Sequence, residues 1–306
     1  MNMSGIIEQM LILFTIMLFG YLAYKRQIFD DAGSKTMSRL VVNITNPALI
    51  ISSVVNVEIP GSKFDNMIVI LIAFSIYIIL PILAVGFRFL LPFSKLKKGD
   101  YQAMFVFTNI GFMGIPVANA VLGPSAVFYL SIFMIPFNIM LYSYGTILLT
   151  NGSDIKITLS KIMNPCVIAA IVALFIYFLN IPTHNVIRTT ASTVGAVTTP
   201  VAMMIIGIEL AKAKLKDVFL DYRMYLFILV KMILCPIVVW LIYRWFIHNE
   251  LLLGIIVIVA GMPCGTNLTL LCKEYDQDCT LVSKAIVIST IMALITIPIL
   301  AATILQ

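Results

Sequence analysis

The chain has 306 residues, of which 61% are hydrophobic and only 11% are charged. Soluble domains carry about 25% charged residues, so this composition excludes a soluble globular protein and indicates an integral membrane protein. The formal net charge of +6 is interpreted as a signal of membrane orientation, and it does not predict a nucleic-acid partner.

Ten apolar segments follow one another along the chain, each close to the roughly 20 residues that a spanning helix needs. Numbered 1 to 10 in chain order, they cover residues 7–24, 36–55, 66–91, 101–122, 126–149, 160–179, 185–211, 220–246, 251–272 and 280–305. The connecting loops are short and leave no room for a soluble domain. The sequence therefore predicts an all-α polytopic protein with ten transmembrane helices.

The distribution of lysine and arginine predicts how these segments are oriented. The loops after odd-numbered segments hold 15 of the 20 basic residues, whereas the loops after even-numbered segments hold 3. Cytoplasmic loops carry the excess of basic residues. We therefore expect a multi-pass protein of the cell membrane, with the odd-numbered loops in the cytoplasm and both chain ends outside it.

Segments 4 and 9 carry glycine and proline in their middle, where proline removes a backbone donor and clashes with the preceding turn. Their central sequences are Thr108-Asn109-Ile110-Gly111-Phe112-Met113-Gly114-Ile115-Pro116 and Gly261-Met262-Pro263-Cys264-Gly265-Thr266-Asn267. A break in hydrocarbon is tolerated only where it is buried in protein or lines a cavity. We predict helix breaks at Gly111, Gly114, Pro116, Pro263 and Gly265; the alternative is that the glycines only permit close helix packing.

Landmark residues recur in the two halves of the chain. Three pairs share nearly one offset: Pro47 and Pro200 (153 residues), Pro81 and Pro236 (155), and Gly114 and Gly265 (151). This predicts two homologous halves, residues 1–150 and 151–306, with five segments each. Because five is odd, the second half is expected to be inverted relative to the first, as in many secondary transporters.

The two interrupted segments predict a binding site for an anion, because a broken helix exposes N–H groups and a partial positive charge at the start of its second half. The predicted substrate-binding residues are Thr108, Asn109, Gly114, Asn138, Lys231, Thr266 and Asn267. Lys231 either faces a substrate carboxylate, serves as a fixed counter-charge, or extends to the membrane surface. Asn138 either lines the cavity or bonds a neighbouring helix.

The sequence contains none of the common catalytic motifs. H-E-x-x-H, G-x-S-x-G and the P-loop are absent, and none of the five cysteines forms a Cys-x-x-Cys pair. We therefore expect no enzymatic activity, no cofactor and no metal site.

These motifs resemble the auxin efflux carrier family, which includes plant auxin carriers and bacterial carboxylate permeases. The matching residues are Asn109 with Met113-Gly114-Ile115-Pro116, Pro263-x-Gly265 followed by Lys273-Glu274-Tyr275, and Pro47, Gly207 and Pro298. The resemblance covers almost the whole membrane region. The long central loop of many plant members is missing, since only residues 150–159 separate the halves.

The resemblance implies two inverted five-helix repeats whose broken helices 4 and 9 cross at mid-membrane, an architecture like that of NhaA and the bile-acid symporters. It also implies a scaffold of helices 1, 2, 6 and 7, usually dimeric, and a mobile transport domain of helices 3–5 and 8–10. By resemblance, Asn109 helps to bind the substrate carboxylate, and Pro116 and Pro263 are the crossover prolines. A polar residue found near Ile50 in plant auxin carriers is missing, which favours a smaller carboxylate than auxin.

The predicted function is secondary transport of a small organic anion, such as malate or malonate, by an elevator movement of a homodimer in the lipid bilayer. Two alternatives stay open. The first is a Na⁺- or H⁺-coupled symporter or exchanger of the same fold. The second is a membrane sensor that binds a ligand without moving it.

Overall fold

In the computed structural model, described for residues 3–88, 98–150, 152, 162–212, 222–278 and 280–304, all of the regular elements are helices. Seven helices in this part of the chain are long and apolar enough to cross a membrane, and three shorter apolar helices accompany them. The predicted all-α polytopic class is therefore confirmed. The count of ten crossings stays a prediction.

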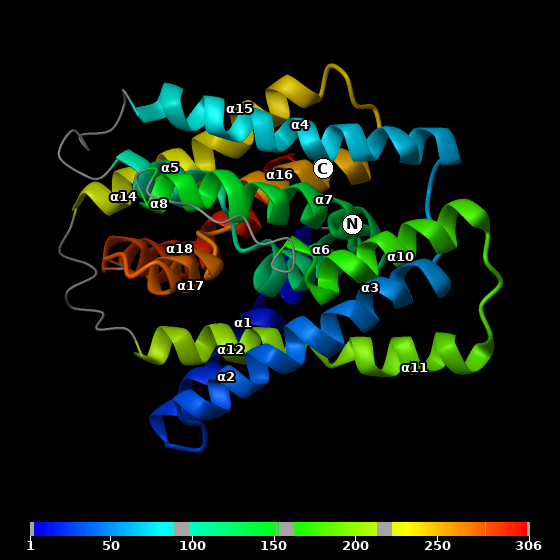
Figure 1. Ribbon diagram of the computed structural model, residues 1–306, viewed down its shortest axis with the longest axis horizontal. Coiled ribbons are helices and arrows are strands. Elements are labelled where there is room, and N and C mark those ends of the chain that lie inside the picture. Colours follow the sequence, from blue (N-terminus) through cyan, green and yellow to red (C-terminus); the bar gives the residue numbers. More distant parts are fainter. Residues whose placement is uncertain are drawn as a thin grey trace. The chain divides into compact units, whose positions relative to one another are not determined.

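The helices form two compact units, each assembled from separated stretches of chain (Figure 1). The first unit contains Met1–Ala73, Gly111–Ile135 and Ser160–Lys212, and the second contains Phe74–Ile110, Pro136–Leu159 and Ala213–Gln306. Both units draw on both sequence halves. The division into repeats 1–150 and 151–306, and the grouping into scaffold and transport helices, stay predictions. Their junction at residues 151 and 153–161 lies outside the described residues.

The first unit is built from helices whose main chains approach closely. Its elements are α1 (Met3–Lys25), α2 (Asp31–Leu40), η1 (Val41–Thr45), α3 (Asn46–Val55), α6 (Ile115–Leu122), α10 (Pro165–Leu179), α11 (Asn185–Ala196) and α12 (Thr198–Lys212). Helix α1 packs along α12, where a Cβ atom at Gly20 would collide with the main chain of Met204, and one at Gly207 with that of Met17. Small residues permit this backbone-to-backbone packing in membranes.

The second unit contains the remaining helices of the described chain. They are α5 (Lys98–Val106), η4 (Leu141–Gly145), α8 (Thr146–Thr150), α14 (Tyr222–Leu229), η5 (Val230–Leu234), α15 (Cys235–Tyr243), α16 (Glu250–Gly261), α17 (Asn267–Glu274) and α18 (Thr280–Ile304). Three elements begin in one unit and end in the other: α4 (Lys63–Phe87), α7 (Ser125–Met140) and η3 (Ile110–Gly114). In the core of the second unit, the ring of Phe107 packs edge-on against Phe137, and Phe137 packs likewise against Tyr77.

Three prolines inside apolar segments share one local geometry. The π-helical turns η1, η3 and η5 each end two residues before a proline, namely Pro47, Pro116 and Pro236. Proline lacks the N–H for the normal bond and its ring clashes with the carbonyl four residues earlier. The wider π turn gives that carbonyl room, and such turns are frequent at functional sites. These prolines therefore widen helices without ending them.

Candidate functional site

Both interrupted segments are broken, and each break is a short non-helical stretch. Segment 4 is divided between α5, which ends at Val106, and η3, which begins at Ile110. Segment 9 is divided between α16, which ends at Gly261, and α17, which begins at Asn267. The break in segment 9 therefore contains Pro263 and Gly265, as the sequence predicted.

The position of the break in segment 4 differs from the sequence prediction. Gly111, Gly114 and Pro116 lie after the break, within the continuous helix formed by η3 and α6. The π turn accommodates Pro116, and only Phe107, Thr108 and Asn109 are non-helical. The expectation that the two glycines and Pro116 form the break itself was therefore wrong.

The two breaks pair with each other inside the second unit. Thr108 and Cys264 form an antiparallel β-bridge. The Asn109 N–H donates to the Pro263 carbonyl at 2.8 Å, and the Gly265 N–H donates to the Phe107 carbonyl at 2.8 Å. Each break thus satisfies main-chain groups that the other releases, which is necessary away from water.

A glycine and a serine support this pairing. A Cβ atom at Gly265 would lie 2.9 Å from the Thr108 carbonyl oxygen, so the close approach requires glycine. The Cys264 N–H donates to Ser289 Oγ of α18 at 3.1 Å, and Ser289 Oγ donates to the Ile286 carbonyl at 3.1 Å. Sequence reasoning did not find Ser289, because a lone serine in an apolar helix carries no local signal.

Lys231 is fully buried in η5 and bonds the end of a broken helix. Its Nζ donates to the Ala260 carbonyl at 2.6 Å and lies 5.3 Å from the centroid of the Phe105 ring. Ala260 belongs to the last turn of α16 and Phe105 to the last turn of α5. The C-terminal end of a helix carries unsatisfied carbonyls and a partial negative charge. The ammonium group thus lies at the negative end of α16 and over a ring from the last turn of α5.

The other predicted residues divide between the paired breaks and the rest of the fold. Thr108 and Asn109 are buried in the break, and Thr266 and Asn267 are half-buried where α17 begins. Thr108 Oγ1 is buried and has no hydrogen-bond partner among the described residues. Asn138 is buried on α7 in the second unit. Of the Lys273-Glu274-Tyr275 motif, the Lys273 and Glu274 side chains lie outside the described residues.

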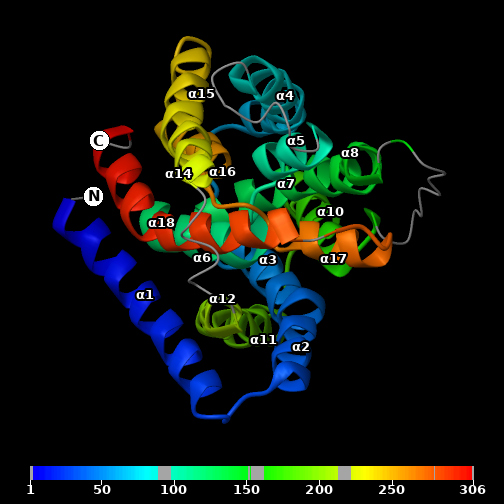
Figure 2. The same cartoon turned by 90° about the vertical axis from the view of Figure 1, so that its left-hand side faces the viewer.

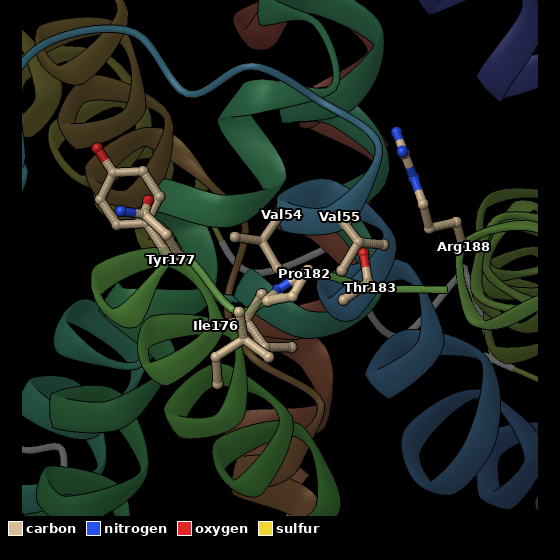
Figure 3. A pocket seen from close by; sticks show the side chains of 9 residues that line it. Val54, Val55, Ile176, Tyr177, Pro182, Thr183 and Arg188 are labelled. Carbon is tan, nitrogen blue, oxygen red and sulfur yellow. The ribbon is translucent and has the colours of Figure 1, made fainter. Parts of the chain in front are cut away.

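A separate cavity of about 400 Å³ lies in the first unit (Figure 3). Its lining residues are Val54, Val55, Ile176, Tyr177, Asn180, Ile181, Pro182, Thr183 and Arg188. Arg188 Nε donates to Asn56 Oδ1 at 3.3 Å. None of the predicted site residues lines this cavity.

Comparison with known proteins identifies the class. The model of a family described as "Membrane transport protein" matches residues 5–158 and 149–301 of the chain. The chain therefore belongs to this family of membrane transporters, and the resemblance to the auxin efflux carriers is confirmed. An uncharacterized transporter of Methanothermobacter thermautotrophicus is 21% identical over 300 residues, which cover 97% of this chain and 98% of that protein.

Family membership and the helices together establish the general function. The chain is a multi-pass membrane protein that belongs to a family of membrane transporters. The paired breaks and Lys231 are buried polar features of its second unit.

Proposed function

We propose that this transporter is a secondary carrier for a small organic anion, a mono- or dicarboxylate such as malate or malonate. The observation that carries the proposal is the antiparallel pairing of the two helix breaks at Thr108 and Cys264. Paired interruptions in corresponding positions of two repeats are where secondary transporters bind substrate. The three landmark pairs of the sequence support such a repeat here.

The polar groups at the paired breaks suit a carboxylate. The Asn109 and Gly265 N–H groups are used in the pairing itself, so they are not available to a ligand. The side-chain donors at the breaks are the hydroxyl groups of Thr108 and Thr266 and the amides of Asn109 and Asn267. Helix α17 begins at Asn267, and the partial positive charge at its N-terminus favours a negatively charged ligand there.

Lys231 completes the electrostatic argument as a positioning residue. Its charge offsets the negative ends of α5 and α16, which would otherwise repel an anion bound at the breaks. The Ala260 contact supports the fixed counter-charge among the three interpretations of Lys231. In the proposed cycle, an elevator movement of the transport helices against a dimeric scaffold carries the site across the cell membrane.

The test is uptake of a panel of mono- and dicarboxylates by protein reconstituted in lipid vesicles. We expect uptake of one acid by the wild type, and its loss in Asn109→Ala. The matched control is Asn43→Ala, which removes an exposed amide whose Nδ2 donates to the Arg39 carbonyl one turn earlier. Unchanged affinity and uptake in Asn109→Ala would refute the site.

The same vesicles separate the alternatives. Uptake that requires an imposed Na⁺ or pH gradient would indicate a coupled symporter or exchanger. Binding of an acid by the purified protein without uptake would instead support a membrane sensor.

A further inference from the structure

Three buried oxygen atoms of the first unit have no hydrogen-bond partner among the described residues. They are Thr45 Oγ1, Asn46 Oδ1 and Thr198 Oγ1. The three residues are 2%, 1% and 0% exposed, so these atoms do not reach open solvent. Buried polar atoms are normally paired, and each exception requires an explanation.

Thr45 and Thr198 lie where the continuous helix of α2, η1 and α3 crosses the helix pair α11 and α12, and Asn46 directly follows Thr45 in the chain. Figure 1 shows the line of α2 and α3 crossing that of α11 and α12, and Figure 2 shows α11 and α12 beside α2 and α3. Beyond the crossing on one side, a Cβ atom at Gly195 would lie 2.8 Å from Leu49 Cα. On the other side, Val41 and Ala202 share one buried cluster. Thr45 and Thr198 lie midway between these two contacts on their respective helices, so helical periodicity places both on the faces that the two helices turn toward each other.

The three buried atoms are all oxygens, and each has lone pairs that can accept a hydrogen bond or coordinate a cation. Asn46 Nδ2 donates to the Gly111 carbonyl at 3.4 Å, which fixes the amide nitrogen there and leaves Oδ1 as an acceptor. Pro200 has no N–H to donate to the Ala196 carbonyl one turn earlier. The corresponding proline of the other line, Pro47, likewise releases carbonyls, and that of Val42 receives the Cys166 thiol at 3.3 Å.

We propose that Thr45, Asn46 and Thr198 form a binding site for a small monovalent cation, for which Na⁺ is the probe. Hydroxyl, amide and carbonyl oxygens are hard ligands, and transporters hold Na⁺ with such oxygens beside interrupted helices. No carboxylate is assigned to the site: Glu209 of α12 accepts from Lys212 at 2.8 Å and from Ser34 at 3.3 Å. With neutral ligands the site binds weakly, and it does not depend on which anion is carried.

The test is thermal unfolding of the purified protein in NaCl against choline chloride at constant ionic strength, with no carboxylate present. We expect Na⁺ to raise the Tm of the wild type saturably, by about 2–4 °C. Thr45→Val and Thr198→Val remove one ligand each at nearly constant volume and should abolish the Na⁺-dependent rise. Thr193→Val, at an exposed position of α11, is the matched control and should retain it.

Several outcomes would overturn the proposal. One is the absence of a Na⁺-dependent rise in the wild type, and another is an equal rise in all the variants. A third is a valine variant whose Tm exceeds that of the wild type by the same amount in NaCl and in choline chloride. Such a result would show that the site is dry or holds only water. If a valine variant fails to fold, Thr198→Ser keeps the hydroxyl group and must retain the Na⁺ response. Because no carboxylate is used, failure here leaves the anion site to its own uptake test.

Discussion

At the scale of single residues, the paired breaks depend on atoms that approach more closely than side chains allow. Gly265 stands against the main chain of Thr108, and the two hydrogen bonds between the breaks form only at this separation. A larger residue at position 265 would separate the two breaks and leave buried main-chain groups without hydrogen-bond partners, which is unfavourable.

Gly265→Ala is therefore expected to lower the free energy of unfolding by about 1–3 kcal/mol, because the added Cβ pushes the Thr108 carbonyl away and strains both bonds. The measurement is denaturation of the purified protein in detergent. Gly86→Ala is the control, since a Cβ at Gly86 meets no atom within 4 Å and alanine favours a helix. Equal stability of the two variants would contradict the close-approach argument.

At the scale of elements, the sequence predicted the all-helical class and identified the two segments that are broken, because composition and proline act locally. It misplaced the break in segment 4, since Pro116 is absorbed by a π turn. Phe107 to Asn109 are extended because they pair with residues 263–265, more than 150 residues along the chain. No local pattern carries such a contact, and the contact between Lys231 and Ala260 was hidden for the same reason.

Lys231→Met tests what the buried ammonium group does for the two half-helices. A buried charge without a carboxylate partner is unfavourable, so methionine should leave the free energy of unfolding unchanged or raise it. Uptake of the proposed carboxylate substrate should nevertheless fall by about tenfold, equivalent to about 1.4 kcal/mol of lost electrostatic stabilisation. The two readouts are thermal denaturation and vesicle uptake.

Lys284→Met provides the comparison for this change. Lys284 lies near the start of α18 and is half-buried, so its loss should affect neither quantity appreciably. A Lys231→Met protein that transports normally would show that the charge has only a packing role.

At the scale of the whole molecule, chain connectivity joins two units that each take elements from both sequence halves. The two units reflect how the helices pack, whereas the predicted repeats, residues 1–150 and 151–306, are successive halves of the sequence. The sequence predicts the inversion from an odd segment count, and the basic residues predict the side of each loop. Both expectations concern the bilayer, so they need a measurement made across it.

Corresponding loops of inverted repeats must face opposite sides of the membrane, which makes Gln27 and Ile181 a matched pair. They follow segments 1 and 6, the first segment of each half, and both are exposed. Cys166, Cys235, Cys264 and Cys272 are buried, so a Cys279→Ser background leaves an introduced cysteine as the accessible thiol among the described residues. We expect a membrane-impermeant maleimide to label Ile181→Cys on intact cells, and Gln27→Cys only after permeabilisation. Labelling of both from one side would mean that the halves are not inverted. The proposed anion site would then lose the support that it draws from an inverted repeat. Labelling of Gln27→Cys alone on intact cells would keep the inversion and reverse the orientation, against the 15 to 3 distribution of basic residues.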